Sequence, residues 1–358
     1  MKIRAAVITY HDINNYGAQL QAASLQRFIE AQGINVHLLD YRPLRSRIRI
    51  AMVYIRLLAR LDFKSFKREL TKRQMFTSSI SRLANVDNFK VYTQQAVSKI
   101  CASKYDYLVC GSDELWNFDN YLGYQTPYIL DFPVTESTKK ISYAASMGYC
   151  KPDGLLKKSM VDAISKFSTV MVRDPYTKQF VDSQSNKTAE RVVDPTFLWD
   201  FKDIKPQISK KYILLTGGAA LQANVISHAK KLAELENLDI VTIGATPQGL
   251  EHTVVVPTPE EWIGYIKYAN YHITSLFHGS IFSMKHRTQF AVVVPSDKTQ
   301  KITSLLSLFK QTNRALDVEF SEDELIRALN VSFDEDFEKA AVDAITKSKT
   351  ALKMALGK

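Results

Sequence analysis

The stretch IRAAVITYHDINNYGAQLQAASLQRFIEAQGINVHLLD, residues 3–40, predicts how the chain begins to fold. Its apolar run 3–9 is typical of a strand, 18–32 of a helix that ends at Gly33, and 35–40 of a second strand. A strand, a helix and a strand in this order predict two parallel strands joined by a right-handed crossover. This first segment therefore predicts an α/β fold.

The same alternation of strands and helices continues along the chain. Further strands are expected at 105–110, 140–145 and 169–172, and again at 212–216, 239–243, 271–274 and 289–294. The stretch 200–211 between the two series is polar and lacks periodicity, which is typical of a linker. We therefore expect two Rossmann-like domains that face a cleft, 1–200 and 212–334, followed by a terminal helix over 335–358.

The composition narrows the class of protein. With 46% hydrophobic and 23% charged residues, the chain resembles ordinary globular proteins. Its three cysteines form no Cys-x-x-Cys pair, so we expect reduced thiols in a cytosol and no metal site. The N-terminal apolar run is too short for a signal peptide, and no segment is long enough to span a membrane. We expect a cytoplasmic protein.

No Gly-x-Gly-x-x-Gly or Walker-type phosphate loop occurs, so nucleotide binding by those routes is not supported.

The positive charge is concentrated in one segment. Of the total net charge of +10, residues 42–73 carry +9, because eleven Lys and Arg outweigh Asp62 and Glu69. The spacing predicts a helix with a cationic face of Arg45, Arg49, Arg56, Arg60, Lys64 and Lys67 and an apolar face of Ile50, Val53, Tyr54, Leu57, Leu58 and Leu61. Such a helix suits an anionic membrane surface, and a merely solvated surface helix is the alternative. No nucleic-acid recognition module lies beside it, so a nucleic acid is not expected as a partner.

Six short motifs occur in order along the chain. They are TYHDINNYGAQLQA (9–22) closed by DYRP (40–43), YD (105–106) with GSDELWN (111–117), YAAS (143–146), VRD (172–174), VDPT (193–196) and TSLFHGSIFS (274–283). In this order and spacing they resemble the polysaccharide pyruvyl transferase family.

The resemblance implies a fold and a reaction. The fold is similar to the two-domain architecture of GT-B glycosyltransferases, with the acceptor on the N-terminal domain and the donor on the C-terminal one. The donor is phosphoenolpyruvate, a co-substrate, and no separate cofactor is expected. The acceptor is a sugar, carried on a lipid, that receives a pyruvate ketal during capsule or exopolysaccharide synthesis.

Two positions depart from the family's pattern. Some members carry an arginine about two residues before the motif histidine, where it holds the donor carboxylate. Ser275 and Leu276 occupy that stretch here, so that role falls to another residue. The usual Gly-Ser-Asp-Gln motif is Gly-Ser-Asp-Glu in this chain, and Glu114 adds a charge that could alter acceptor choice.

Candidate catalytic residues follow from the chemistry of ketal formation. His278 is the candidate acid, because an imidazole can donate a proton near neutral pH. It precedes Gly279 and Ser280, which open a predicted helix whose N–H groups attract an anion. A helix cap or a satisfied core position is the alternative for His278. Asp113 is the candidate base for the acceptor hydroxyl, or a residue that simply caps a turn.

Candidate binding residues come from the same motifs. Arg173 ends a predicted strand, and its guanidinium suits a carboxylate or a phosphate, with an ion pair to Asp174 or Asp194 as the alternative. The donor-binding set is Arg173, Ser275, Gly279 and Ser280. The acceptor-binding set is Asn14, Asn15, Gly17, Trp116 and Asn117, in which an aromatic ring and amides suit a sugar. Ordinary turn and N-cap roles are the alternative for Asn14, Asn15 and Gly17.

Two other functions share these features. A GT-B glycosyltransferase that uses a nucleotide sugar would have the same fold, although we identify no base or ribose contacts for it. A non-catalytic member of a polysaccharide assembly complex would also keep the fold. The intact His278 and Arg173 favour an enzyme over that second alternative.

Overall fold

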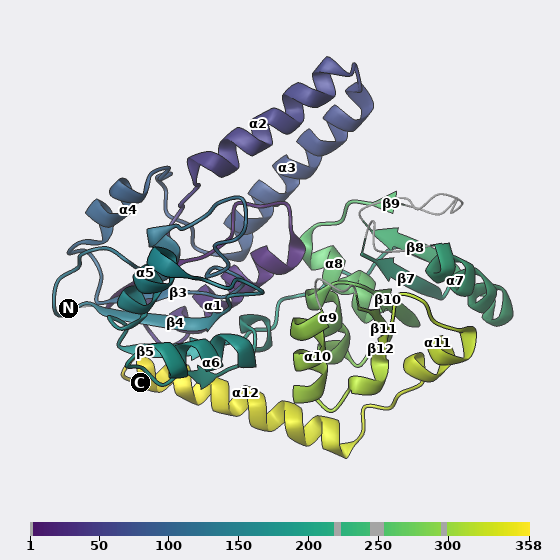
Figure 1. Ribbon diagram of the computed structural model, residues 1–358. Helices are drawn as coiled ribbons and strands as arrows, with labels where there is room; N and C mark the ends of the chain where they lie inside the picture. Colours follow the sequence, from purple (N-terminus) through teal and green to yellow (C-terminus); the bar gives the residue numbers. More distant parts are fainter. Residues whose placement is uncertain (1–2, 218–222, 244–253, 295–298) are drawn as a thin grey trace. The chain divides into compact units, whose positions relative to one another are not determined.

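The computed structural model describes residues 3–217, 223–243, 254–294 and 299–358. The chain divides into two compact units, one of residues 1–200 with 345–358 and the other of residues 201–344. Each unit contains one six-stranded sheet in which every pair of neighbouring strands is parallel (Figure 1). The predicted α/β fold class is confirmed.

The first unit has the strand order β2-β1-β3-β4-β5-β6. Its strands are β1 (Arg4–Ile8), β2 (Asn35–Leu38), β3 (Tyr107–Cys110), β4 (Lys139–Ala145), β5 (Thr169–Val172) and β6 (Glu190–Arg191). Its helices are α1 (Tyr16–Glu30), α2 (Leu44–Ala59), α3 (Phe63–Leu83), α4 (Gln94–Cys101), α5 (Gly154–Ile164) and α6 (Pro175–Gln184), with short 3-10 turns η1 (Thr126–Ile129) and η2 (Pro195–Phe197). Because β2 and β3 lie on opposite sides of β1, the winding of the chain reverses between β1 and β3.

The second unit has the strand order β12-β11-β10-β7-β8-β9. Its strands are β7 (Tyr212–Thr216), β8 (Asp239–Ile243), β9 (Val254–Val255), β10 (Tyr271–Thr274), β11 (Gln289–Val293) and β12 (Ala315–Leu316). Its helices are α7 (Ala223–Glu236), α8 (Pro259–Lys267), α9 (Phe277–His286), α10 (Thr299–Leu308) and α11 (Glu322–Leu329), with a 3-10 turn η5 (Thr312–Arg314). The winding reverses here between β7 and β10. Gly218 and Gly244, which come shortly after the strands expected at 212–216 and 239–243, lie outside the described residues.

A long helix, α12 (Glu335–Ala355), follows α11. Its last residues pack within the first unit, where the Tyr107 hydroxyl donates to the backbone oxygen of Leu356 over 3.0 Å. The backbone N–H of Val193 donates to the Ser348 hydroxyl over 3.0 Å. These bonds attach the end of the chain to β3 and to the segment after β6.

A local hydrogen bond determines where α1 begins. Asn15 is the N-cap of α1, and its side-chain oxygen accepts from the backbone N–H of Ala18 over 3.1 Å. The helix therefore starts at Tyr16, two residues before the predicted start. It ends two residues before the predicted end, and Gly33 follows with a positive φ of 77° that suits glycine.

The basic segment 42–73 is two helices instead of the single helix expected from its periodicity. Leu61 has a positive φ of 54°, which breaks the helix after α2. Asp62 then caps α3 by accepting from the backbone N–H of Ser65 over 3.0 Å. The two helices form a hairpin in which Tyr54 packs edge-on against Phe66, with 5.6 Å between the ring centroids (Figure 1).

Candidate functional site

In open parallel sheets, ligands bind beyond the carboxyl ends of the strands, at the point where the winding reverses. In the first unit this point lies between the loops that follow β1 and β3. The loop after β1 carries Asn14 and Asn15, and the loop after β3 carries Asp113 and Asn117. The strand order thus brings together two of the motifs that are about a hundred residues apart in the sequence.

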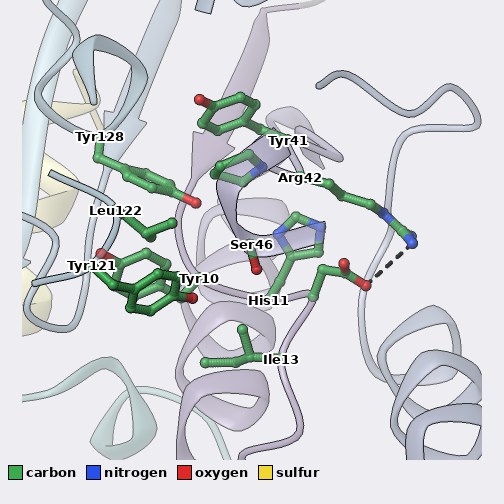
Figure 2. A pocket seen from close by; sticks show the side chains of 11 residues that line it. Tyr10, His11, Ile13, Tyr41, Arg42, Ser46, Tyr121, Leu122 and Tyr128 are labelled. Atoms are coloured by element: carbon green, nitrogen blue, oxygen red, sulfur yellow. Dashed lines mark ion pairs between the residues drawn. The ribbon is translucent and has the colours of Figure 1, made fainter. Parts of the chain in front are cut away.

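A pocket opens beside the loop that follows β1 (Figure 2). The space at this pocket, counted together with the open solvent at its mouth, is about 300 Å³. It is lined by Tyr10, His11, Asp12, Ile13, Tyr41, Arg42, Pro43, Ser46, Tyr121, Leu122 and Tyr128. Four of these are tyrosines, and the rings of Tyr10 and Tyr128 meet edge to face at 4.8 Å. Aromatic rings with polar groups at their edges suit a sugar. Tyr10 and Tyr41 lie within the motifs 9–22 and 40–43, but none of the four tyrosines was among the site residues predicted from the sequence.

Ion pairs fix the wall of the pocket. The Asp40 carboxylate accepts two bonds from the Arg42 guanidinium, at 2.6 and 2.9 Å, and lies 3.0 Å from His11 Nε2. Burial alone would raise the pKa of Asp40, but hydrogen bonds from His11 and Arg42 outweigh it and lower that pKa to about 2. Arg42 and Arg73 also pair with Asp12, which joins this wall to α3.

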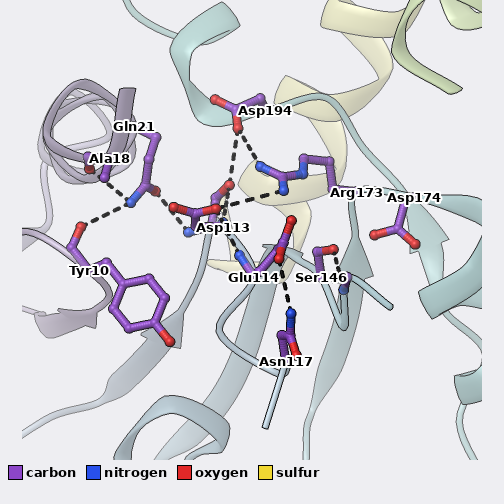
Figure 3. A network of polar contacts seen from close by, with 12 residues as sticks. Tyr10, Ala18, Gln21, Asp113, Glu114, Asn117, Ser146, Arg173, Asp174 and Asp194 are labelled. Carbon is purple, nitrogen blue, oxygen red and sulfur yellow. Dashed lines mark hydrogen bonds and ion pairs between the residues drawn. The ribbon is translucent and has the colours of Figure 1, made fainter. Parts of the chain in front are cut away.

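A polar cluster lies beyond the ends of β3 and β5 (Figure 3). Arg173 is buried and donates to Asp194 over 3.1 Å, and a second guanidinium nitrogen lies 3.8 Å from the Asp113 carboxylate. The ion pair with Asp194, one of the alternatives considered for Arg173, is therefore present. Burial alone would lower the pKa of Arg173, but attraction to Asp113 and Asp194 raises it, so the guanidinium stays charged.

Hydrogen bonds tie the cluster to the first helix. Asp194 accepts from the Ser112 hydroxyl over 3.2 Å, and the backbone N–H of Ser112 donates to Gln21 over 3.0 Å. The Gln21 amide in turn donates to the Thr9 hydroxyl over 2.9 Å. Sequence reasoning did not assign Asp194 or Gln21 to the site, although both lie within the quoted motifs.

Asp113 is the member of this cluster that reaches solvent. Its side chain is 22% exposed, compared with 6% for Arg173 and 0% for Asp194. Asp113 also has a positive φ of 81°, a conformation that aspartate and asparagine tolerate better than most residues. Its carboxylate accepts from the backbone N–H of Glu114 over 2.9 Å, so it caps the following turn as well. The structure therefore holds this carboxylate in one orientation with one edge accessible.

The neighbouring loop restrains Glu114. Its carboxylate accepts from the Asn117 amide over 3.1 Å. A Cβ at Gly148 would lie 2.7 Å from that carboxylate, so a larger residue there would displace the end of the Glu114 side chain. Glu114, the extra charge relative to the family's usual motif, is thus tied to Asn117 in this state.

The predicted acceptor residues occupy different kinds of position in the structure. Asn14 is half-buried, and among the described residues its Oδ1 atom is one of the buried oxygens with no hydrogen-bond partner. A buried polar atom without a partner is a candidate ligand contact. Asn15 serves as the N-cap of α1, and Gly17 is buried in its first turn and not in the loop. The N-cap and helix roles explain both residues without a ligand.

The expectation that Trp116 stacks on a sugar is wrong. Its ring is fully buried, packs edge-on against Phe167 and donates from Nε1 to the backbone oxygen of Tyr128 over 3.2 Å. A buried indole whose N–H is satisfied has no face left for a ligand. Trp116 belongs to the core of the first unit.

In the second unit the winding reverses between β7 and β10, and three of the four predicted donor residues, Ser275, Gly279 and Ser280, lie at this point. The fourth, Arg173, lies in the first unit. Gly217 follows β7, and a Cβ there would lie 2.2 Å from the Ser275 hydroxyl oxygen. The backbone after β7 therefore packs directly against the loop after β10. Ser275 is fully buried by this contact.

His278 is the second residue of α9, so it lies in the first turn and not before the helix. The N-cap is Leu276, which makes no side-chain bond to the first turn. The Leu276 side chain therefore accepts no hydrogen bond from the backbone N–H groups of the first turn. These N–H groups form the positive end of the helix dipole. The Ser280 hydroxyl is buried and donates back to the Leu276 carbonyl over 3.3 Å. His278 is half-buried, whereas Ser275 and Ser280 are turned into the protein.

A buried network beneath α9 was not expected from the sequence. His272 lies on β10 with its ring nitrogens 2.8 Å from the Thr216 hydroxyl and 2.7 Å from the Ser283 hydroxyl. Burial lowers the pKa of His272 to about 3, so the ring is neutral. Because it joins β7, β10 and α9, this network holds the helix that carries His278 in place.

Gly279 has a packing role in the same region. A Cβ there would lie 2.5 Å from the Thr274 hydroxyl oxygen and 3.3 Å from the His272 ring. We expect Gly279→Ala to lower the free energy of unfolding by about 1–3 kcal/mol, because α9 must shift away from β10. Urea denaturation of the two proteins measures the change. An unchanged midpoint would show that the helix accommodates the methyl group, with Ser280→Ala as the control for a small change in the same turn.

Comparison with known proteins places these sites in a family. A model of the polysaccharide pyruvyl transferase family matches residues 15–297, well over half of the chain. No curated protein sequence is similar enough to this chain to count as a relative.

Solved structures share the fold at low sequence identity. A UDP-GlcNAc 2-epimerase from Methanocaldococcus jannaschii has a TM-score of 0.58 at 9% identity, with 100% of both chains covered. A putative UDP-N-acetylglucosamine 2-epimerase from Listeria monocytogenes has a TM-score of 0.56 at 11% identity, with 100% of this chain and 97% of that one covered. A spinosyn rhamnosyltransferase has a TM-score of 0.48 at 11% identity, with 99% of this chain and 100% of that one covered. At these identities the likeness to the two epimerases shows the fold alone, which is an α/β architecture with two parallel sheets. The matched range contains Asp113, Arg173 and His278, and the chain belongs to the polysaccharide pyruvyl transferase family.

Proposed function

We propose that this protein transfers an enolpyruvyl unit from phosphoenolpyruvate to a sugar hydroxyl and forms a pyruvate ketal in capsule or exopolysaccharide synthesis. One observation carries the proposal. In each unit the family's motif residues lie where the winding of the parallel sheet reverses, with Asp113 in the first and His278 in the second. This is the position at which open α/β sheets bind their ligands.

The chemistry requires a proton, a nucleophile and a leaving group. The acid protonates the methylene carbon of phosphoenolpyruvate, and an acceptor hydroxyl bonds to the neighbouring carbon as the bond to phosphate breaks. A second hydroxyl then closes the ketal. Overall, a diol and phosphoenolpyruvate give a ketal and inorganic phosphate. The diol loses two hydroxyl protons, while one proton is added to the methylene carbon to make the methyl group and one is taken up by the phosphate.

The second unit supplies the donor side in this proposal. Phosphate binds at the N-terminus of α9, where backbone N–H groups and the helix dipole favour an anion. His278 in that turn delivers the proton. Ser275, Gly279 and Ser280 shape the turn from within, since they are buried or closely packed against β10.

The first unit supplies the acceptor side. The accessible edge of Asp113 accepts a proton from the acceptor hydroxyl, and Arg173 holds that carboxylate in position. Asn14 and Asn117 each have a buried amide oxygen without a partner among the described residues, and we assign these amides to acceptor contacts. The pocket with the four tyrosines offers a surface for a sugar ring nearby.

Arg173 provides a test of whether it serves the fold or the donor. Removing one partner of a buried ion pair leaves the others uncompensated, so Arg173→Ala should lower the free energy of unfolding by about 3–5 kcal/mol. Urea denaturation measures this loss, and Arg173→Lys should recover part of it because the charge remains. Normal stability together with a raised Michaelis constant for phosphoenolpyruvate would instead assign Arg173 to donor binding.

The direct test of the function is product analysis. The protein is incubated with phosphoenolpyruvate and a panel of nitrophenyl glycosides, and in parallel with nucleotide sugars. The proposal expects a product with the mass of the glycoside plus pyruvate less one water, and release of inorganic phosphate. Glycosyl transfer from a nucleotide sugar without any reaction of phosphoenolpyruvate would establish a glycosyltransferase instead.

We further propose that the natural acceptor is lipid-linked and that the enzyme works at the inner face of the plasma membrane. Among the described residues, no helix combines the length and the hydropathy needed to cross a bilayer. In this proposal a surface of the folded units associates with the membrane. The basic segment predicted from the sequence is the candidate.

A further inference from the structure

The helices α2 and α3 expose an unusual amount of apolar surface. Nine large apolar side chains on this hairpin are 39–73% exposed: Leu44, Ile48, Met52, Val53, Ile55, Leu58, Leu61, Phe63 and Leu70. In α2 the only buried residue is Ser46. A concentration of exposed apolar side chains on one element marks an interaction surface.

Part of this surface forms a stripe that was not predicted from the sequence. Leu44, Ile48, Met52 and Ile55 follow one another at steps of four, four and three, so they lie on one face of α2. The apolar face predicted from the sequence is covered only in part. Ile50, Tyr54 and Leu57 are half-buried, whereas Val53, Leu58 and Leu61 are 43%, 43% and 73% exposed. Tyr54 packs against α3, whereas the four side chains of the stripe are 53–64% exposed.

The rest of the hairpin is firmly attached to the first unit. Phe76, Ile80 and Leu83, in the second half of α3, are buried. The Gln19 amide of α1 donates to the backbone oxygen of Phe76 over 2.8 Å. The ion pair of Arg73 with Asp12 adds a second attachment. The exposed stripe is thus presented by an anchored element, and Figure 1 shows α2 and the start of α3 extending away from the sheet.

The positive charge of the hairpin indicates which kind of partner covers the exposed stripe. The segment 42–73 has a net charge of +9, and its cations Arg45, Arg49 and Arg56 each follow a residue of the stripe directly in the sequence. The apolar stripe is therefore flanked by positive charge. This arrangement is typical of helices that lie in the plane of an anionic bilayer, with apolar side chains among the acyl chains and cations at the headgroups.

We infer that the α2–α3 hairpin inserts the stripe of Leu44, Ile48, Met52 and Ile55 into an anionic lipid bilayer. A second copy of the chain fits this surface less well, because two segments of +9 would repel each other. Membrane insertion would bring the enzyme to the lipid-linked acceptor, so this inference rests on the proposed function. Its test needs no turnover.

The experiment measures binding of the full-length protein to vesicles by sedimentation. Vesicles of phosphatidylcholine alone are compared with vesicles that also contain phosphatidylglycerol. The wild-type protein should bind the anionic vesicles. The variant Ile48→Ser/Met52→Ser/Ile55→Ser should bind them at least about tenfold more weakly, because three inserted apolar side chains are lost.

A charge variant tests the second component. Arg56→Glu/Arg60→Glu/Lys64→Glu should weaken binding by about 100-fold or more, because each cation near an anionic surface contributes roughly a factor of five. These three side chains are exposed, whereas Arg45 and Arg49 contact Leu122 and Tyr121 and are left intact. The matched control is Leu155→Ser/Leu235→Ser/Met354→Ser, which removes three apolar side chains, 84%, 73% and 72% exposed, from outside the hairpin. The control should bind as the wild type does.

Insertion itself is measured by fluorescence. Met52→Trp should give emission that brominated lipids quench, whereas Leu155→Trp should add no quenched component. Wild-type affinity in the serine variant, or no quenching of Met52→Trp, would overturn insertion. A dimer in sedimentation velocity that the serine variant dissociates, with no vesicle binding, would identify a second copy as the occupant and overturn the inference.

The inference and the proposed function can fail separately. Vesicle binding without any reaction of phosphoenolpyruvate would sustain the membrane surface and remove the function. Turnover of a soluble glycoside without vesicle binding would sustain the function and remove the membrane surface.

Discussion

Replacing His278 by Gln should lower turnover by about 10²–10⁴-fold, while the Michaelis constant for phosphoenolpyruvate changes far less. Glutamine is close to histidine in size and keeps a hydrogen-bond donor in the first turn of α9, but it cannot deliver a proton to carbon. The backbone N–H groups that favour the donor phosphate stay in place, which is why donor affinity should survive. Release of inorganic phosphate, followed at saturating and limiting donor, separates the two quantities.

A second measurement identifies the proton. In deuterated water the wild-type enzyme should place solvent deuterium in the new methyl group of the ketal, because the ring proton exchanges with solvent. His286→Gln is the matched control, since His286 lies in the last turn of the same helix and stacks on Phe282. Near-normal turnover of His278→Gln would remove His278 from the acid role, and Asp113 and Glu114 would be the next residues to test.

The second large effect is expected for Asp113→Asn. This variant should lower turnover by about 10²–10⁴-fold, because an amide cannot accept the proton of the acceptor hydroxyl. Asparagine tolerates the positive φ of 81° at this position and can still accept from the backbone N–H of Glu114. The fold should therefore be preserved, and the Michaelis constant for phosphoenolpyruvate should change little. Circular dichroism and steady-state kinetics check the two statements.

Glu114→Gln serves as the matched control for Asp113. It removes a neighbouring negative charge while an amide can still bond to Asn117. We expect a change of less than tenfold in turnover for this variant. A larger loss for Glu114→Gln than for Asp113→Asn would make Glu114 the base and reduce Asp113 to the residue that caps the turn.

Several site residues were predictable because their role is local. A capping asparagine at residue 15 and a histidine near the start of a helix depend on neighbours within a few positions along the chain. The motif order was sufficient to point to Asp113, Arg173 and His278, and the structure places each at the carboxyl end of a parallel strand. Whether those side chains perform the proposed roles stays a prediction.

Other features could not be predicted because they depend on residues far apart in the sequence. Trp116 has the chemistry of a sugar platform, but Phe167 and the carbonyl of Tyr128 enclose it. Arg173 has the chemistry of an anion receptor, but Asp194 already pairs with it. In both cases the residue type indicates what a side chain can bind, whereas burial and partners determine what remains accessible.

The sequence by itself determined that the chain alternates strands and helices in two series, because hydrophobic periodicity and caps act over short distances. It also located the excess positive charge in residues 42–73. Only the tertiary structure decided the strand order, and with it which loops meet where the winding reverses. It also decided that one apolar face of α2 packs towards α3 while the stripe from Leu44 to Ile55 stays exposed. The physical reason is that helical spacing defines the faces of a helix, but the direction in which the chain turns afterwards determines which of those faces is covered.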